Sequence, residues 1–292
     1  MSKKRNSSNI GLHAAFIIIT AMFIVPLIIA IMISFSTESD VLRYGYSIIP
    51  KHFTLEAYKT AFGDSTALVR AYGITILTSF LNSSLTVILT GVMSYPLARE
   101  EFTPRKYIMI YVLITMLFGG GLIPTYILNT QYLHLGNTIW IYIVTGLISG
   151  SNIILFKTSF SQIPKSLMEA AEIDGATQLQ VCAHVVIPTC KPIIAMIFFN
   201  TFLGHWNDYT TSMYYISDSR LYSLQYFLNR IITNSEFVKA TYKMFNLTMT
   251  EDIPLQTLRF AVCVLGAMPV LILFPMIQKY FSKGITSGSV KG

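Results

Sequence analysis

The sequence of 292 residues is 53% hydrophobic and 13% aromatic, with 12% charged residues and a formal net charge of +7. An average soluble domain has roughly a quarter of its residues charged, so this composition argues against an ordinary cytosolic enzyme. It also excludes a disordered or nucleic-acid-binding tail, which needs few apolar and many charged residues. Three cysteines cannot build a disulfide framework. The bilayer is therefore the expected solvent of much of the chain.

Six apolar runs without charged residues have lengths that suit a bilayer, because a transmembrane helix needs about 20 such residues. The third and fourth runs are continuous except for the polar, turn-forming segment 131–137. The predicted spans are residues 11–36, 71–98, 107–130, 137–156, 192–212 and 259–279. The sequence thus predicts an all-α membrane protein with a transmembrane domain over residues 11–280, an N-terminal segment 1–10 and a C-terminal tail 281–292.

The distribution of Lys and Arg predicts the orientation of these spans. With the N-terminus inside, the inner segments hold twelve cations and five anions, and the outer segments hold nine of each. The whole positive surplus then lies on the cytoplasmic side, together with both termini and the long loop 161–190. The basic segment before the first span is not followed by a cleavage site of small residues, so we expect an uncleaved anchor.

The sequence lacks the common signatures of catalysis and of nucleotide binding. It contains no G-x-x-x-x-G-K-[ST], H-E-x-x-H or G-x-S-x-G. The spans are nearly free of ionisable groups, which disfavours a proton-driven carrier or an ion channel but leaves sodium coupling through backbone carbonyls open. Cys182, His184 and Cys190 offer three metal ligands without a fourth, so ordinary packing is the better interpretation.

The inner loop 161–190 has the pattern of a short helix–turn–helix outside the lipid. Pro164 suits the start of a helix, where its missing N–H is harmless. Gly175 permits a left-handed cap at the end of that helix, Thr177 can cap a second helix, and Pro188 is expected to end it. Leu167 and the adjacent alanines would form a small apolar face that fits a groove of another protein. A merely solvated loop is the alternative.

Several residues at fixed offsets in this loop resemble the coupling-loop motif of ATP-binding-cassette importer permeases. The matching residues are Glu169, Ala170, Ala171, Asp174, Gly175, Ala176, Ile187 and Pro188. The resemblance implies that Glu169, Ala170, Ala171, Asp174, Gly175 and Pro188 couple the permease to its ATPase. Cys182 departs from the pattern, since an aromatic residue is common at that position.

Other segments extend the resemblance along nearly the whole chain. Residues 50–58 are similar to the first outer loop of carbohydrate-importer permeases, and 118–125 and 204–207 resemble a subgroup that imports oligosaccharides and uronic-acid-type saccharides. The tail 283–292 is similar to that of the smaller permease of maltose-type systems. By that likeness, Ser287, Gly288 and Ser289 contact the ATPase subunits.

The resemblance implies the six-helix type I importer architecture in a bacterial plasma membrane, with the chain as a non-enzymatic subunit. Its implied partners are a second homologous permease, two ATPase subunits and an extracellular solute-binding protein, besides membrane lipid. The implied substrate is a carbohydrate, and the resembled subgroup points to an oligosaccharide. No cofactor is expected in this chain, because ATP and Mg²⁺ would bind the ATPase subunits, and no nucleic acid is expected. The alternatives are a self-contained secondary carrier or channel, and a membrane-embedded assembly or signalling protein.

The fifth span carries the candidate substrate-path residues Asn200, His205, Trp206 and Asn207. Asn200 and Asn207 share a helix face at the 3.6-residue period and offer hydrogen bonds to sugar hydroxyls. Trp206 offers a flat apolar surface to sugar C–H groups, although it could instead anchor the helix at the outer interface. The glycine run 119–121 is expected to permit bending or close helix packing rather than to contact sugar.

The charge distribution generates a test of the topology. Cysteines introduced at Ser8 and at Ser287 should react with an impermeant thiol reagent only in broken cells, because both positions are predicted to be cytoplasmic. Labelling of either position in intact cells would contradict the predicted orientation.

Overall fold

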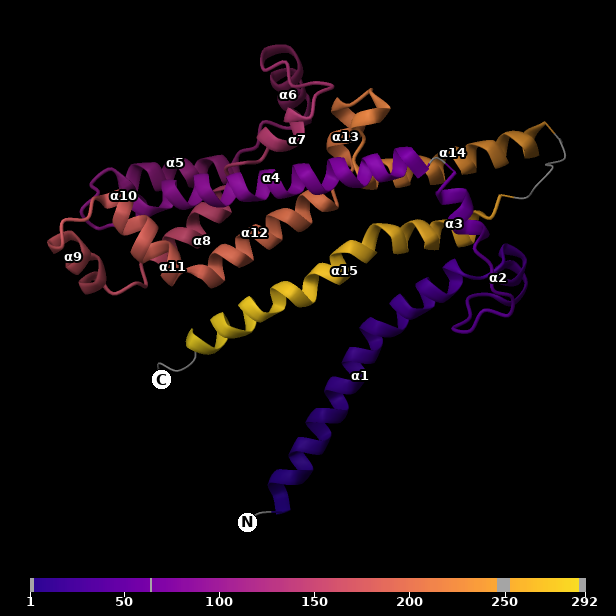
Figure 1. The fold of residues 1–292 in the computed structure, drawn as a ribbon, viewed down its shortest axis with the longest axis horizontal. Helices are drawn as coiled ribbons and strands as arrows, with labels where there is room; N and C mark the ends of the chain where they lie inside the picture. The colour runs from indigo at the N-terminus through magenta and orange to yellow at the C-terminus, as the bar shows by residue number, and fades with distance from the viewer. Residues whose placement is uncertain (1–2, 64, 246–252, 289–292) are drawn as a thin grey trace. The chain divides into compact units, whose positions relative to one another are not determined.

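The computed structural model describes residues 3–63, 65–245 and 253–288. Within these ranges the regular structure is helical, as the sequence predicts, apart from one isolated antiparallel bridge between Ser36 and Phe53. The α-helices (Figure 1) are α1 (Lys3–Ser34), α2 (Glu38–Tyr44), α3 (Glu56–Ala61), α4 (Ser65–Ala98), α5 (Arg105–Leu117), α6 (Leu122–Ile127), α7 (Trp140–Val144), α8 (Gly150–Phe160), α9 (Lys165–Ile173), α10 (Gln178–Val181), α11 (Ile187–Thr189), α12 (Lys191–Trp206), α13 (Thr210–Tyr215), α14 (Leu224–Met244) and α15 (Leu255–Gly288). The π-helical turns η1 (Leu128–Tyr132) and η2 (Cys182–Val186) and the 3₁₀ turn η3 (Ser219–Leu221) complete the order.

Three helical segments of the described chain are long and apolar enough to cross a membrane: Gly11–Ser34, Ser65–Ala98 and Leu255–Pro275. They correspond to the first, second and sixth predicted spans. Two bent helix pairs raise the number to five if each pair counts as one span. Six spans therefore remain a prediction.

The third predicted span, residues 107–130, is not one straight helix. α5 ends at Leu117, and the segment Leu122–Tyr132 continues at an angle of 108°. Gly121 has φ +81°, a left-handed conformation that a residue with a Cβ atom seldom adopts. A Cβ atom on any of the three glycines 119–121 would meet nothing within 4 Å. These glycines therefore permit a bend, one of the two roles expected, and within the described residues no helix packs closely on them.

The fourth predicted span, residues 137–156, is interrupted in its middle. α7 ends at Val144, Gly146 adopts φ +76°, and α8 begins at Gly150. The buried side chain of Asn82 in α4 compensates for the break, because its Nδ2 donates to the carbonyls of Ile143 at 2.9 Å, Thr145 at 3.1 Å and Tyr142 at 3.3 Å. Hydropathy alone does not reveal such a break, since a partner elsewhere in the sequence supplies the lost hydrogen bonds.

α4 presents a continuous buried face of small polar residues. Its members are Thr75, Thr78, Ser79, Asn82, Ser83, Thr86, Thr90 and Ser94. Most of the hydroxyls bond to a carbonyl one turn earlier in the same helix; Ser83 Oγ, for example, donates to Ser79 O at 2.6 Å. The hydroxyl of Ser79 is buried without a hydrogen-bond partner among the described residues. Small side chains let neighbouring backbones approach closely in a membrane. α4 is thus the helix around which its neighbours pack.

The chain divides into two compact units, of which the first comprises residues 1–66 and 227–269. In this unit Glu38, in the first turn of α2, caps the start of α15. The carboxylate accepts hydrogen bonds from the N–H groups of Gln256 and Thr257 at 3.0–3.1 Å. A negative charge at a helix N-terminus satisfies free N–H groups and opposes the helix dipole favourably. One carboxylate therefore joins the beginnings of two helices.

The second unit comprises residues 67–226 and 270–292. Its main apolar cluster joins the end of α4 to the α8–α12 region. The buried members are Tyr95, Phe156, Phe160, Ile163, Met168, Val181, Cys182, Val186, Cys190 and Ile197. α5 packs so closely on α8 that a Cβ atom on Gly150 would lie 2.5 Å from Met116 Cγ.

A buried polar network forms a separate part of this second unit. Tyr142 Oη lies 2.5 Å from Ser212 Oγ, which also accepts a hydrogen bond from the N–H of Ser223 at 2.9 Å. The N–H of Leu224 donates to Thr75 Oγ1 at 2.7 Å. These bonds connect α7, α13 and the segment before α14 to α4.

The interrupted α7–α8 segment yields a prediction about stability. Asn82→Leu should lower the thermal midpoint of the detergent-solubilised protein, because three carbonyls lose a donor in an apolar environment. We expect a loss of about 1–3 kcal/mol. Ser83→Ala is the matched control, since its hydroxyl bonds only within α4. Equal midpoints for the two variants would show that Asn82 does not stabilise the break.

Candidate functional site

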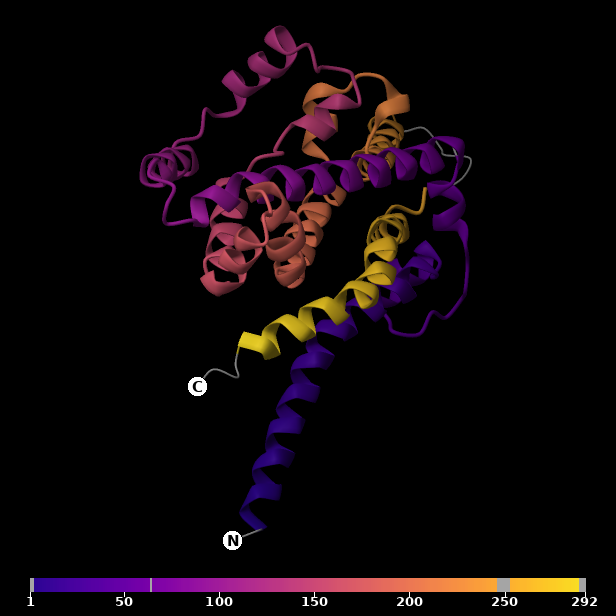
Figure 2. The same ribbon diagram turned by 60° about the vertical axis from the view of Figure 1, so that its left-hand side comes forward.

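The loop 161–190 folds into a projection that we call the knob, defined as α9, the turn at residues 174–177 and α10. Figures 1 and 2 both show the knob at the end of α4. Pro164 precedes α9 as its N-cap residue, and the helix ends at Ile173 with Asp174 as its C-cap. Gly175 follows with φ +88°, and its N–H donates to Glu172 O at 3.0 Å. The predicted first helix and its glycine cap are therefore confirmed.

The second helix begins as predicted but does not end at Pro188. Thr177 caps α10: its N–H and its hydroxyl both contact the Gln180 side-chain oxygen, at 2.8 and 3.0 Å. The helical run then continues through η2 and α11 to Thr189 and meets α12 at 82°. The prediction for Pro188 is wrong by this small margin, because the wider π-helical turn before it, closed by Ile187 N–H to Cys182 O, tolerates a residue without an N–H.

One face of the knob is open. Ile173 and Leu179 are 86% and 72% exposed, and Leu167 is also exposed. Glu169, Ala170 and Asp174 are exposed beside them, whereas Ala171 packs against the apolar cluster. Of the expected apolar face, Leu167 and Ala170 are exposed, whereas Ala171 is not part of it. Ile173 and Leu179 are further exposed apolar side chains that the motif does not mark. A hollow of about 330 Å³ lies beside Gly175, between α9 and α10.

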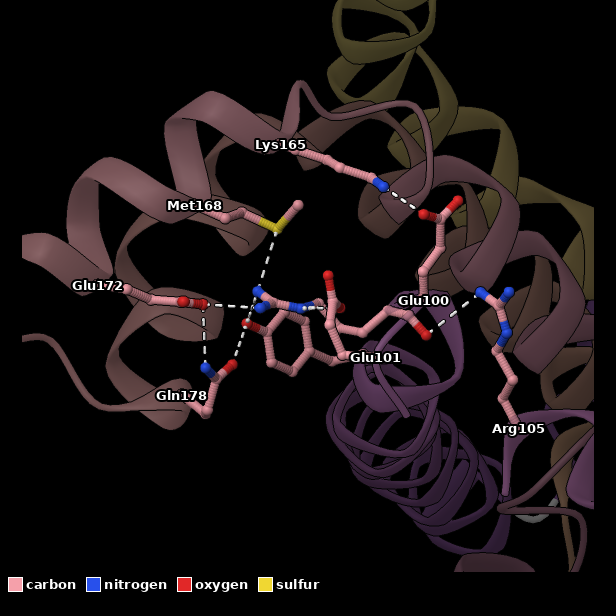
Figure 3. Close-up of polar contacts among 9 residues, drawn as sticks. Glu100, Glu101, Arg105, Lys165, Met168, Glu172 and Gln178 are labelled. Atoms are coloured by element: carbon pink, nitrogen blue, oxygen red, sulfur yellow. Dashed lines mark hydrogen bonds and ion pairs between the residues drawn. The ribbon is translucent and has the colours of Figure 1, made fainter. Parts of the chain in front are cut away.

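The opposite face of the knob is fixed to α4 by a polar network centred on Arg99. Figure 3 shows its members Glu101, Glu172 and Gln178. Arg99 directly follows α4, and its Nη2 donates to Glu172 Oε1 at 2.8 Å, while its Nε reaches Glu101 Oε2 at 3.2 Å. Tyr95 Oη donates to Gln178 Oε1 at 2.9 Å, and Gln178 Nε2 donates to the same Glu172 oxygen at 3.0 Å. Two residues at the end of α4 therefore hold both helices of the knob.

This network also affects the ionisation of one knob residue, Glu172. Hydrogen bonds from Gln178 and Arg99 hold the pKa of Glu172 below its ordinary value. A carboxyl with a lowered pKa stabilises the fold above the ordinary glutamate range, and the effect is lost only as the pH falls through the lowered pKa. The network is therefore complete at neutral pH. Nothing in the sequence relates this network to the motif, because Arg99 and Tyr95 lie about 70 residues before it.

The candidate path residues on α12 separate into two groups. Asn200, Gly204 and Asn207 are exposed on one face, as the helical period predicts. The buried Trp206, 1% exposed, lies away from it and stacks on Phe202 at a ring distance of 6.0 Å. His205 is partly buried. Of the four candidates, Asn200 and Asn207 are the ones on the open face.

Asn200 lines a groove of about 480 Å³ in the second unit. The other lining residues are Asn152, Leu155, Met196, Ile197, Phe199, Leu203 and Phe274. The groove thus combines apolar walls with two amide side chains, from α8 and α12. Asn152 was not anticipated, because nothing in the sequence relates it to Asn200. Asn207 does not belong to the groove lining, and its Nδ2 donates to Leu203 O at 3.0 Å.

The remaining candidates receive less support. Ser287 and Gly288 are the last residues of α15, and Ser289 lies outside the described residues. Cys182 and Cys190 are buried. Among the described residues, no three His, Cys, Asp or Glu side chains are grouped so that they could hold a metal ion.

Comparison of the sequence with known proteins identifies membrane components of transport systems. Residues 6–287 match the family described as "Binding-protein-dependent transport system inner membrane component". The Bacillus subtilis protein LplC is 35% identical over 93% of this chain and 90% of its own length. The polygalacturonan/rhamnogalacturonan transport system permease protein YtcP of the same organism is 33% identical over 92% and 93%.

A solved structure shows the same fold. It belongs to a bacterial ABC transporter involved in the import of the acidic polysaccharide alginate, and the matching chain is 26% identical, with a TM-score of 0.80 over 96% of this chain and 99% of that one. The present chain belongs to the family of membrane components of binding-protein-dependent transport systems. It is accordingly a transporter subunit of the membrane and not an enzyme, because ATP hydrolysis in such transporters lies in partner subunits.

Proposed function

We propose that this chain is one permease subunit of an ATP-driven importer that moves an oligosaccharide from an extracellular binding protein into the cytoplasm. The observation that carries the proposal is the knob. It is a stiff, capped helix–turn–helix with exposed Leu167, Ile173 and Leu179 on one face and a polar attachment to α4 on the other. Such an element suits the groove of a protein partner and can transmit that partner's movement to a membrane helix.

The proposed partners follow from this role. Because the chain has no phosphate-binding loop in its sequence, the energy comes from two ATPase subunits that bind ATP and Mg²⁺ and hold the knob. A second, homologous permease subunit completes the path. We further propose that all six predicted spans cross the membrane, with the bent pair Arg105–Leu117 and Leu122–Tyr132 as one interrupted span and α12 as the helix of the fifth. The knob and both termini are then cytoplasmic.

The groove beside α12 supports the carbohydrate part of the proposal. Amide groups offer both donors and acceptors to sugar hydroxyls, and apolar walls contact the C–H faces of a pyranose ring. Asn152 and Asn200 supply the first, and Leu155, Phe199 and Leu203 the second. The names of relatives that transport polygalacturonan, galactooligosaccharides or arabinooligosaccharides support an oligosaccharide substrate.

The knob leads to a test of coupling. Gly175→Val places a β-branched residue at φ +88°, a strain of about 1–2 kcal/mol or more. Glu169→Lys reverses an exposed charge on the side offered to the ATPase. Both variants should insert into the membrane and assemble less firmly with the ATPase. Both should lose ATP-driven uptake and the ATPase activity that the loaded binding protein stimulates.

The control for this test is Thr158→Ala, an exposed hydroxyl on α8 that bonds only within its own helix. Its uptake should equal that of the wild type. If Gly175→Val kept full uptake and full stimulated ATPase activity, the knob would not be the coupling element, and the proposed function would lose its main support.

The groove leads to a second test. Asn200→Leu should reduce uptake strongly while the complex still assembles, because a lost hydrogen bond removes about 0.5–1.5 kcal/mol and the leucine adds bulk in the groove. Asn207→Leu should reduce uptake less, since the Asn207 side chain bonds to its own helix. Transport assays on purified complexes in liposomes would measure both. Unchanged uptake for both variants would place the path elsewhere.

A further inference from the structure

We propose that Arg99 is the positioning residue of the transport cycle: it keeps the knob in a fixed orientation on α4, so that a movement of the knob becomes a movement of the membrane helix. The inference rests on the proposed function of the knob. Arg99 itself belongs to the short segment between α4 and α5 and is not one of the motif residues.

The first argument is the position of the guanidinium group. The side chain of Arg99 is only 17% exposed, although it lies just beyond the end of α4. Arg105 Nη1 donates to the Arg99 carbonyl at 3.3 Å, which holds the backbone of this segment in place. Arg99 is therefore a fixed group at the helix end and not a solvated surface cation.

The second argument is that this one side chain reaches several partners at once. Its three nitrogens contact Glu172, Glu101 and the Tyr95 hydroxyl, and Met168 Sδ lies 3.9 Å from Nη1. Met168 is the one buried residue of α9. The guanidinium therefore contacts α9 on its buried side. A planar fork with donors in several directions can do this, whereas the single ammonium of a lysine cannot.

The third argument is that Arg99 also acts on the second helix of the knob. Gln178, the first residue of α10, bonds to Tyr95 and to Glu172, two of the groups that Arg99 contacts. The hydrogen bonds among these four side chains form a closed ring that holds α9 and α10 together at the end of α4 (Figure 3). If Arg99 is removed, the Tyr95–Gln178 and Gln178–Glu172 bonds and the apolar packing remain. The α9 carboxylate then keeps a bond to α10 but loses its direct bond to the segment that follows α4.

A second ion pair nearby supplies a matched control. Lys165 in α9 contacts Glu100, the neighbour of Arg99. These two side chains are 57% and 62% exposed, and exposed pairs contribute little because water and salt screen them. Removing that charge pair should leave coupling unchanged, although it joins the same two segments of the chain.

The test uses the assembled complex of both permeases and the ATPase subunits in liposomes, with the loaded binding protein. Arg99→Gln should lower uptake tenfold or more at equal assembly, while ATP is still hydrolysed, so that the sugar moved per ATP falls. Arg99→Lys should fall between this variant and the wild type. Glu172→Gln should also lower the sugar moved per ATP, and Glu100→Gln should stay within about twofold of the wild type.

A distance measurement shows whether Arg99 fixes the orientation of the knob or only stabilises the fold in general. Spin labels at the exposed positions Met93 and Ser166 report the separation of α4 and α9. The distance distribution should be narrow in the wild type and in Glu100→Gln, and broad in Arg99→Gln at the same thermal midpoint. If Arg99→Gln does not assemble, Glu172→Gln breaks the same pair from the other side and decides the question.

Gly175→Val in the same assay separates the role of Arg99 from the proposed function of the knob. If Gly175→Val uncouples transport but Arg99→Gln and Glu172→Gln keep the wild-type sugar moved per ATP and a narrow distance distribution, the role of Arg99 is refuted and the proposed function stands. If Gly175→Val has no effect, the proposed function fails, and with it the basis of the inference.

Discussion

Every backbone carbonyl at membrane depth needs a donor, because lipid offers none, and this constraint explains why α4 is central to the second unit. Interrupting residues 137–156 leaves the carbonyls at the end of α7 without helical partners, and Asn82 of α4 supplies the donor. Most of the small hydroxyl residues along the same face bond to carbonyls within α4, and their size lets the neighbouring helices approach. The break between α7 and α8 therefore depends on α4, which supplies the missing hydrogen-bond donor.

The same helix also holds the knob, on the side that the proposed topology makes cytoplasmic. Its last turn carries Tyr95, and Arg99 follows directly, so the helix that supports the interrupted segment also holds the knob. α12 enters at the other side of the knob, after a bend of 82° at Cys190. A displacement of the knob thus has two direct routes into the membrane helices, one through polar contacts and one through the chain itself. The open Asn200 face lies on the second route.

The combination of an apolar groove and two amides bears on selectivity. Among the described residues, the groove lining at Asn152 and Asn200 contains no charged side chain. The sugar recognition that we propose there would therefore use hydroxyl groups and ring faces rather than acidic substituents. The solved relative belongs to a transporter involved in the import of the acidic polysaccharide alginate. Under the proposed function, recognition of a substrate's charge would belong to other parts of the assembly.

The sequence by itself determined the helical class, the approximate positions of the long apolar segments, and the knob with its caps at Pro164, Gly175 and Thr177, because hydropathy and capping are local properties. It also determined that Asn200 and Asn207 share a face, since the helical period is fixed. Only the tertiary structure decided where helices break and which distant residues compensate. Asn82 reaches a segment about 60 residues away, and Arg99 meets Glu172 after 73. Trp206 is buried for the same reason: a residue's environment depends on helices that neither its own period nor its motif specifies.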